Sequence, residues 1–220
     1  MSQTASSVRA FVAVPLPGEL QARIFAAAQE LARELPSVRW SRKVENLHIT
    51  IKFLDQVPEE KLAVLGTALE QVLTTLPRFR VELRRMGAFP SARHASVLWA
   101  WVDDVEKRLT TVAAAVEEVG ERLGFARERR PFTGHVTVGR SKGGVDARAA
   151  LDAFADREFG ATSVDEIHLY ESQLGGDGST YILRHRAALD SRWEPSEGSQ
   201  TLPRRAPAGK ARRSSRDDSN

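Results

Sequence analysis

The chain has 220 residues, of which 41% are hydrophobic and 7% aromatic, and this composition is typical of a soluble globular protein with one domain or two small ones. It contains no cysteine, which excludes disulfides, thiolate nucleophiles and cysteine-based metal sites. The formal net charge is +3, but residues 191–220 carry seven Lys or Arg against four Asp or Glu, so residues 1–190 hold 25 of each sign. The positive charge therefore belongs to the end of the chain and is no evidence that the folded part binds nucleic acid through charge.

The hydrophobic pattern of the first part of the chain predicts strands that alternate with two helices. A strand is expected over residues 9–14, followed by a helix that opens in the segment PLPGEL and ends near residue 35. Two strands follow, over residues 37–41 and 46–54. Residues 57–76 predict the second helix, because their apolar side chains have the spacing of one buried helical face: Leu62, Leu65, Leu69, Val72 and Leu73.

The rest of the folded part is expected to continue this alternation. In order, the pattern predicts strands over residues 78–85 and 96–102, a third helix capped by Asp103 or Asp104 and ending near Gly124, a strand over residues 132–140, a Lys-Gly-Gly turn, and a short helix around residues 147–154. The segments SVDEIHLYESQL and STYILRHRAAL then form a pair of strands joined by the turn GGDGS.

A β-α-β-β unit with a His-x-Thr strand occurs twice in this order. Its two histidines, His48 and His135, are 87 residues apart, about half of the folded chain, which predicts two lobes of similar plan within one bilobal domain of residues 1–190. Residues 191–220 are rich in Ser, Pro, Gly and Arg and predict a disordered basic tail, with Trp193 as a candidate anchor for its beginning. The tail either adds affinity for the phosphates of a nucleic acid or serves as a solubilising extension.

Neither an export signal nor a membrane segment is predicted. The first residues lack a basic region ahead of the short apolar run FVAV, and no stretch approaches the roughly 20 apolar residues of a membrane helix. A cytoplasmic protein with no membrane partner is therefore expected.

The segments NLHITIKFL and RPFTGHVTVGR share one arrangement of polar and β-branched residues. Strict alternation in a strand places His48 and Thr50 on one face of the first segment, and His135 and Thr137 on one face of the second, while isoleucines and valines point to the core. A histidine and a threonine two residues apart stand about 6.6 Å from each other, so both can touch one phosphate.

These residue types suit the opening of a cyclic phosphate. One imidazole can accept the proton of an attacking water while a second, protonated imidazole donates a proton to the departing ribose oxygen. Threonine hydroxyls can donate hydrogen bonds to the non-bridging oxygens, where negative charge accumulates. The scheme requires no metal.

LHITIKFL and GHVTVGR resemble the paired His-x-Thr-x (HXTX) motifs of the 2H phosphoesterases. The flanking sequence is similar to the RNA 2′,3′-cyclic phosphodiesterases, also called the 2′-5′ RNA ligase family, over roughly residues 8–189; the similar segments are RAFVAVPLP, VRWSRKVENLHITIKFLDQVPEEKL, GAFPSARHASVLWAWV, LGFARERRPFTGHVTVGRSK and VDEIHLYESQL. The resemblance implies an α+β fold that is two-lobed and pseudo-symmetric, in which antiparallel sheets line a central cleft and helices pack outside.

The resemblance also implies an activity and roles for the motif residues. The activity is hydrolysis of a 2′,3′-cyclic phosphate at an RNA or nucleotide 3′ end to a 2′-phosphomonoester. His135 would be the proton acceptor that activates water and His48 the proton donor, while Thr50 and Thr137 would bind the phosphate. No metal and no cofactor are implied, and a monomer is expected.

A third phosphate-binding group is implied at Arg140, which matches an arginine five residues after the second histidine in relatives. Strict alternation from His135 places Arg140 on the opposite face of the strand, so a strand end or a bulge is needed to return it. Arg130, at the entrance to the motif, is the alternative phosphate or substrate contact.

The sequence departs from the family pattern at two positions. Gly134 stands where a proline is usual before the second histidine, which can loosen the positioning of that histidine. Asp55 stands where glycine commonly follows the first motif, and it can form the same turn if it adopts a positive φ. Neither departure removes a catalytic group.

Other residues have less specific interpretations. His94, His168 and His185 lack a matched context and are interpreted as surface or core residues. Four aromatic residues are candidates for stacking on a base or for the core, with Phe132 likewise ambiguous: Trp40, Phe53, Trp99 and Trp101.

Alternatives to RNA-end hydrolysis are small cyclic nucleotides or an ADP-ribose cyclic phosphate as substrate, and a nucleotide- or RNA-binding module of the same fold without significant turnover. The family name also implies the reverse reaction, 2′-5′ ligation, but nothing in the sequence supplies an energy source for it.

Overall fold

The chain folds as an α+β protein, as expected from its sequence. The computed structural model describes residues 6–176 and 178–192. Its strands are β1 (Ser7–Pro15), β2 (Arg39–Trp40), β3 (His48–Pro58), β4 (Phe79–Ser91), β5 (His94–Asp103), β6 (His135–Val145), β7 (Glu158–Val164), β8 (Glu166–Gly175) and β9 (Gly178–Ala188). Its helices are α1 (Gly18–Glu34), α2 (Glu59–Leu73), α3 (Arg108–Arg122) and α4 (Arg148–Asp152), with a 3₁₀ turn, η1 (Val44–Asn46). Apart from its first two residues, the predicted basic tail lies outside the described residues, as does Trp193.

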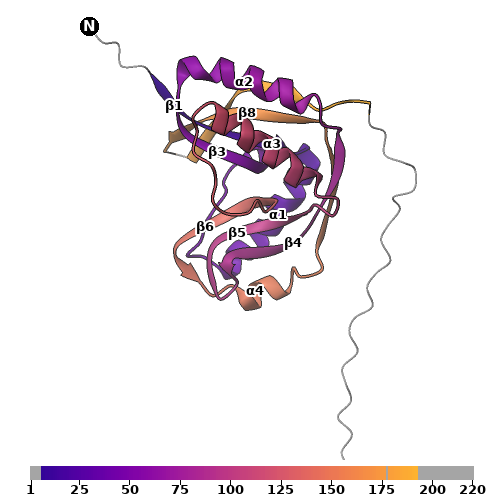
Figure 1. Cartoon of the computed structure of the whole chain (residues 1–220). Coiled ribbons are helices and arrows are strands. Elements are labelled where there is room, and N and C mark those ends of the chain that lie inside the picture. Colours follow the sequence, from indigo (N-terminus) through magenta and orange to yellow (C-terminus); the bar gives the residue numbers. More distant parts are fainter. Residues whose placement is uncertain (1–5, 177, 193–220) are drawn as a thin grey trace, which may run out of the picture.

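The strands of the described residues form one antiparallel sheet that is nearly divided at its centre. The order is β7-β4-β5-β6-β3-β1-β8-β9, and the short β2 pairs with β6. At the centre, β3 and β6 share a single bridged pair, Ile49 with Val136. The sheet therefore has a β3 half, made of β3, β1, β8 and β9, and a β6 half, made of β6, β5, β4, β7 and β2. Figure 1 shows the two halves one above the other, with the labelled β3 and β6 between them. The predicted two-lobed plan is confirmed.

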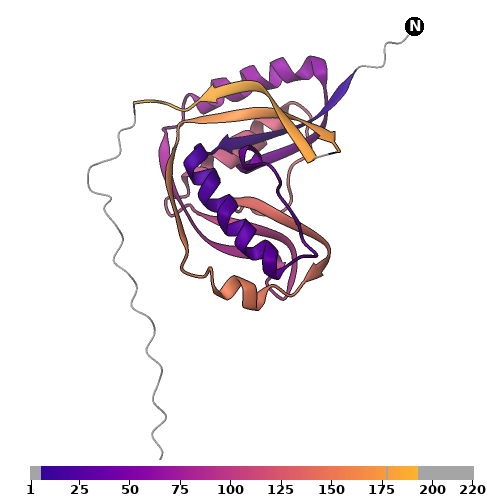
Figure 2. The ribbon, with the colours of Figure 1, turned by 180° about the vertical axis from the view of Figure 1, so that it is seen from behind.

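Helices α1 and α3 connect the two halves, because each follows a strand of one half and packs against the other half. Helix α1 follows β1 of the β3 half but packs against β6, β7 and α4 of the other half. Helix α3 follows β5 of the β6 half but packs against β3 and α2. Figure 1 shows α2 and α3 beside β3 and β8, and Figure 2, from behind, shows α1 lying across the strands of the other half. The segments 35–47 and 123–134, which follow these helices, each cross back to the strand that carries a histidine.

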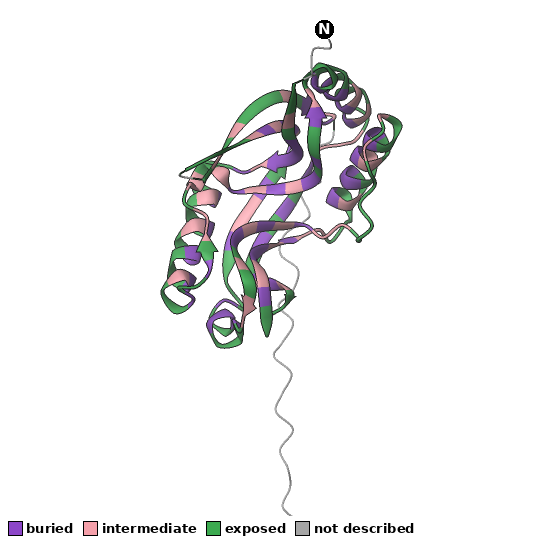
Figure 3. Cartoon of the chain, turned by 90° about the vertical axis from the view of Figure 1, so that its left-hand side faces the viewer, coloured by how far each residue is buried: buried purple, intermediate pink, exposed green. Residues whose placement is uncertain are grey.

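The core lies between the helices and one face of the sheet. Helix α1 buries one face at the spacing of an amphipathic helix, with Leu20, Ile24, Ala27, Ala28 and Leu31. Figure 3 shows the helices at the two flanks of the strands, with green, exposed residues on their outer sides. None of the helices within residues 6–176 and 178–192 is long and apolar enough to cross a membrane.

Several local predictions are confirmed. The Asp104 carboxylate accepts hydrogen bonds from the backbone N–H groups of Leu109 and Thr110, at 3.0 and 2.9 Å, and thereby caps the start of α3. Gly124 follows α3 with a φ of +86°, the left-handed conformation expected at a helix C-terminus. Strands β8 and β9 form the predicted pair, in register from Glu166 with Ala188 to Gly175 with Gly178.

One predicted turn was wrong, and one strand was not predicted. The Lys-Gly-Gly segment is not a turn, because β6 continues through it to Val145, which pairs with Ala95 of β5. Strand β7 was not predicted, because the segment EFGATSV lacks clear alternation; its Gly160 has a φ of +125° in the structure. Its pairing with the distant β4 makes it a strand.

Candidate active site

The two His-x-Thr segments lie side by side at the centre of the sheet. Ile49 pairs with Val136 in antiparallel register, and both side chains are 0% exposed. Continuing this register by one residue in each direction sets His48 opposite Thr137, and Thr50 opposite His135. Because side chains alternate between faces, these four side chains share the face that points away from the buried pair. The structure therefore brings together the four motif residues predicted from the sequence.

Each imidazole forms a hydrogen bond with the backbone carbonyl of the residue two positions before it. The Nδ1 of His48 lies 2.8 Å from the carbonyl oxygen of Asn46, and the Nδ1 of His135 lies 2.7 Å from that of Thr133. A carbonyl oxygen can only accept, so Nδ1 carries the proton and donates it in both rings. In the neutral ring this leaves Nε2 as the basic atom. For His48, Nε2 lies 3.0 Å from the hydroxyl of Thr50.

Both histidines are neutral at pH 7 in the free protein. Burial lowers the pKa of His48 to about 4; the hydrogen bond to Asn46 opposes this, and the charges of His135 and Arg140 add to it. Burial also lowers the pKa of His135 below its usual 6.5, opposed by the hydrogen bond to Thr133 and reinforced by the charge of Arg140. These effects show that Arg140 lies close enough to act on both imidazoles.

Arg140 reaches this face because β6 contains a bulge. Thr137 pairs with Trp99 of β5. The preceding residue of β5, Leu98, pairs with Gly139 and not with Val138, so Val138 is an additional residue on β6. Val138 and Gly139 are consequently both buried, and Arg140 is exposed on the side of Thr137. The bulge predicted as one way to return Arg140 is therefore present.

The β3 strand contains a matching bulge. Ala13 of β1 pairs with Thr50 and the preceding Val12 pairs with Lys52, which leaves Ile51 as the additional residue. Ile51 and Lys52 are both buried, and the next residue, Phe53, is 64% exposed. Phe53 and Arg140 thus occupy equivalent places, five residues after their histidines and beyond a bulge.

Aromatic rings surround the two imidazoles. The ring of Phe11 stacks on His48 with centroids 4.8 Å apart, and Tyr181 contacts the same imidazole edge-on at 5.3 Å. Phe89 contacts the ring of His135 edge-on at 5.1 Å. Sequence reasoning missed these three residues, because an aromatic residue in a strand gives no signal that separates a core position from one beside a histidine.

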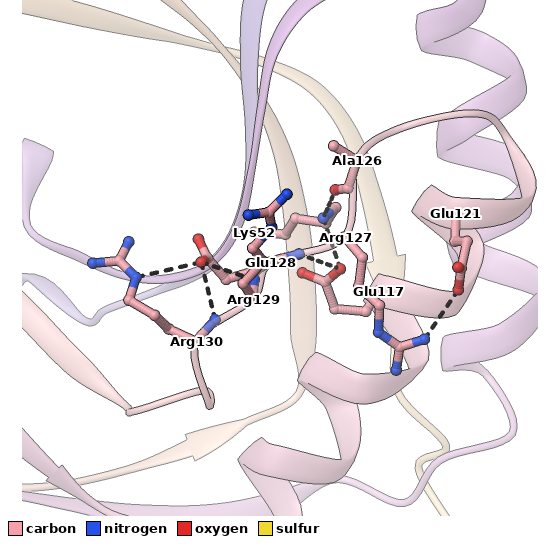
Figure 4. Close-up of polar contacts among 8 residues, drawn as sticks. All are labelled: Lys52, Glu117, Glu121, Ala126, Arg127, Glu128, Arg129 and Arg130. Carbon is pink, nitrogen blue, oxygen red and sulfur yellow. Dashed lines mark hydrogen bonds and ion pairs between the residues drawn. The ribbon is translucent and has the colours of Figure 1, made fainter.

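An ion pair between buried Lys52 and half-buried Glu117 joins β3 to the segment that precedes His135. The Lys52 ammonium lies 2.8 Å from the Glu117 carboxylate of α3 and donates to the carbonyl of Ala126 at 2.8 Å. The same carboxylate accepts from the backbone N–H of Glu128 at 3.3 Å. A Cβ at Gly120 would lie 2.9 Å from the Lys52 side chain, so the glycine leaves room for it. Figure 4 shows Lys52 among these partners.

In the described residues, no hydrogen bond or ion pair connects Arg130 to either motif histidine. Its side chain is 87% exposed and pairs with the Glu128 carboxylate, with Nε 3.3 Å from Oε1, as Figure 4 shows. Arg127, in the same segment, turns to Glu121 at 3.0 Å. The role of Arg130 as a substrate contact stays a prediction.

Known proteins are similar to this chain in sequence and fold. A protein-family model described as the 2′-5′ RNA ligase superfamily matches residues 16–176. The chain belongs to this superfamily. Similar curated members are the proteins named RNA 2′,3′-cyclic phosphodiesterase of Archaeoglobus fulgidus, 33% identical over 79% of this chain and 96% of the relative, and of Methanocaldococcus jannaschii, 30% identical over 79% and 96%.

Solved structures have the same fold. Escherichia coli LigT complexed with 3′-AMP superposes with a TM-score of 0.68 and 26% identity, covering 84% of this chain and 99% of LigT. A Thermus thermophilus protein superposes with a TM-score of 0.71 over 84% of this chain and 100% of its own, at 24% identity. The predicted 2H phosphoesterase fold is confirmed.

The two departures from the superfamily pattern are accommodated locally. Asp55 has a φ of +55°, so it adopts the left-handed conformation that its position requires. Gly134 is buried, and a Cβ there would lie 3.0 Å from Leu109 and 3.2 Å from Val102, closer than ordinary contacts. Leu109 and Val102 thus fill the space that the side chain of a larger residue before His135 would need.

The remaining histidines lie apart from the motif residues. His168 is buried and its two ring nitrogens contact Tyr170 and Glu166, at 2.7 and 2.6 Å, which suits a structural role. His185 lies 3.3 Å from Glu70, and His94 is exposed. In the part of the chain that the structure describes, no three His, Asp or Glu side chains are grouped so that they could hold a metal ion.

Proposed function

We propose that this protein hydrolyses 2′,3′-cyclic phosphate ends of RNA or nucleotides to 2′-phosphomonoesters. The observation that carries the proposal is the pair of imidazoles whose Nδ1 atoms donate to backbone carbonyls, 2.8 and 2.7 Å away, beside two threonines on one face of the sheet. The relatives named RNA 2′,3′-cyclic phosphodiesterase support the same reaction and an RNA substrate.

In the proposed mechanism the two histidines have opposite tasks. Nε2 of His135 accepts the proton of a water molecule that attacks phosphorus, and His48 donates a proton from Nε2 to the 3′ oxygen as its bond to phosphorus breaks. The threonine hydroxyls of Thr50 and Thr137 donate hydrogen bonds to the non-bridging oxygens, and the guanidinium of Arg140 offsets their charge.

The proton that His48 donates is taken up when substrate binds. In the free protein the pKa of His48 is about 4, lowered first by burial and then by nearby positive charge. A cyclic phosphate placed between the motif residues adds a negative charge beside the imidazole and offsets Arg140, which raises that pKa again. His135 remains the neutral base because its own pKa is lowered by burial.

The proposal also covers metal dependence, oligomeric state, cellular location and the reverse reaction. The reaction is proposed to need no metal and no cofactor, because the two imidazoles supply both proton transfers. The protein is proposed to act as a cytoplasmic monomer, and 2′-5′ ligation is the reverse of the hydrolysis, which water and the missing energy source disfavour. Escherichia coli LigT was crystallised with 3′-AMP, which supports a site that accepts a nucleotide.

The test is incubation with an RNA oligonucleotide that ends in a 2′,3′-cyclic phosphate, in buffer containing EDTA. A 2′-phosphate product, identified by mass spectrometry and phosphorus NMR, is expected. Intact ends, a 3′-phosphate product or activity that requires added metal would contradict the proposal. Tight binding of a 2′-phosphate product without turnover would instead support a binding module. Parallel rates on a cyclic mononucleotide and on ADP-ribose cyclic phosphate identify the preferred substrate.

A further inference from the structure

The short strand β2 sets a second arginine directly opposite Arg140. Arg39 pairs with Arg140 and Trp40 pairs with Gly139, in antiparallel register. A Cβ at Gly139 would lie 2.9 Å from the Trp40 ring and 2.8 Å from Val38, so these side chains cover the core side of β6. Alternation then turns Arg39 to the opposite side, and residues directly opposite in a sheet share one face. Arg39 therefore lies beside Arg140 on the face that carries the histidines.

This arrangement places two like charges next to each other. Like charges directly opposite on neighbouring strands destabilise the sheet. Both arginines are exposed, and within residues 6–176 and 178–192 neither guanidinium has a hydrogen bond or an ion pair with another residue. By contrast, several exposed arginines elsewhere are paired with a carboxylate: Arg127, Arg148, Arg157 and Arg192. In the described part of the chain, no carboxylate is therefore paired with these two arginines to relieve the repulsion.

The geometry points to Arg39 as the contact for the phosphate that lies 5′ to the cyclic end of an RNA strand. This inference rests on the proposed function, which places the cyclic phosphate among the motif residues and Arg140. A cyclic mononucleotide has no further phosphate, whereas an RNA strand carries one at each following linkage. Arg39 lies opposite Arg140 on the neighbouring strand β2, and its guanidinium can form hydrogen bonds to the next phosphate. The substrate class assigned by this residue is an RNA strand end rather than a mononucleotide.

The experiment compares Arg39→Gln with the unaltered protein on two substrates over a range of salt concentrations. One substrate is a nucleoside 2′,3′-cyclic monophosphate and the other a short RNA with the same cyclic end. Arg39→Gln is expected to lower kcat/KM about tenfold on the RNA and to leave the mononucleotide unchanged, which is the effect of one lost charge-assisted contact. The slope of log kcat/KM against log salt should become less steep by about 0.7 on the RNA, the value for one phosphate contact in a single strand.

Two further variants make the result specific. Arg33→Gln, at the exposed end of α1, a helix that packs against β6 and β7, makes the same change of charge outside the proposed contact and should leave both substrates unaffected. Arg39→Lys keeps the charge, so it should retain the salt slope while losing part of the rate on RNA. Equal losses on both substrates, or no loss on either, would overturn the role of Arg39.

A binding measurement separates this inference from the proposed reaction. The dissociation constant of an RNA ending in a 2′-phosphate, relative to that of a nucleoside 2′-monophosphate, requires no turnover. If the unaltered protein left cyclic ends intact, the proposed hydrolysis would fail, while a loss of preference for the RNA in Arg39→Gln would still support the phosphate contact. A preference unchanged by the substitution would refute it.

Discussion

Ile49 and Val136 form the bridged pair between the two strands that carry the histidines, and both side chains are fully buried. Their register determines that each histidine stands opposite the threonine of the other strand. The pair is thus a packing contact that also sets the spacing of the four motif side chains.

Ile49→Ala should lower the free energy of unfolding by about 2–5 kcal/mol, because it leaves a cavity between the halves of the sheet. Urea unfolding measures this change. Val64→Ala on the outer side of α2, where Val64 is 56% exposed, is the control and should have little effect. A similar effect of the two substitutions would show that the contact does not hold the halves together.

His48→Ala and His135→Ala should each lower turnover of a cyclic phosphate by roughly 10²-fold or more, the usual scale for general acid–base catalysis. A substrate in which the 3′ oxygen is replaced by sulfur distinguishes the two roles, since a thiolate leaves without being protonated. His48→Ala should regain activity on the sulfur substrate and His135→Ala should not. The opposite pattern would exchange the roles of donor and acceptor.

Acid should destabilise the protein through His48. Its pKa is about 4 in the folded protein, against about 6.5 when unfolded, so the unfolded chain binds more protons between these values. The stability that neutral His48 retains above pH 6.5 is lost as the pH falls toward 4, by about 2 kcal/mol at pH 5. Urea unfolding at pH 5 and 7.5 should show a smaller pH dependence in His48→Gln than in the unaltered protein. The exposed His94→Gln is the control, and equal dependence in all three proteins would contradict the assignment.

Lys52→Met should cost roughly 3 kcal/mol of stability, because it leaves the Glu117 carboxylate, whose side chain is only 15% exposed, without its cation. The double variant Lys52→Met, Glu117→Leu removes both charges and should be less destabilised than the single one. Hydrogen exchange should show faster opening of residues 125–134 in both variants, since the Lys52 bond to Ala126 is lost. Unchanged exchange there would mean that the pair does not hold the segment before His135.

Phe53 is a candidate stacking platform for the base beside the cyclic phosphate, because its exposed ring lies on the face that carries the histidines. Phe53→Ala should raise KM about tenfold for a purine substrate, the scale of one base–aromatic stack. An abasic ribose 2′,3′-cyclic phosphate should show no such change. Leu174→Ala, at another exposed apolar residue, serves as the control. An equal loss on the abasic substrate would argue against stacking.

The motif residues were predictable because they follow local rules. Alternation within each strand predicts that His48 and Thr50 share one face, and the Asp104 cap and Gly124 terminus follow from local residue preferences. These features need only a few neighbouring residues to be recognised.

The rest of the site depends on contacts between distant segments. The face on which Arg140 lies is decided by a bulge, which exists only in the pairing of β6 with β5. Phe11 and Tyr181 reach His48 from β1 and β9, and no local pattern connects them. The cross-strand neighbour of Arg140 likewise comes from a strand of two residues, which is too short for periodicity to indicate its register.

Helices α1 and α3 each pack on the half of the sheet other than the one they follow in sequence, and this has a consequence for how the chain folds. The apolar side of the β6 half is covered by α1, which follows a strand of the other half, while α3, which follows β5 of the β6 half, packs on β3 beside α2. A β6 half that formed alone would leave part of its apolar face in water because α1 would be missing, and its α3 would lack the packing against β3 and α2. We therefore expect the two lobes to unfold together in a single transition rather than as two independent domains.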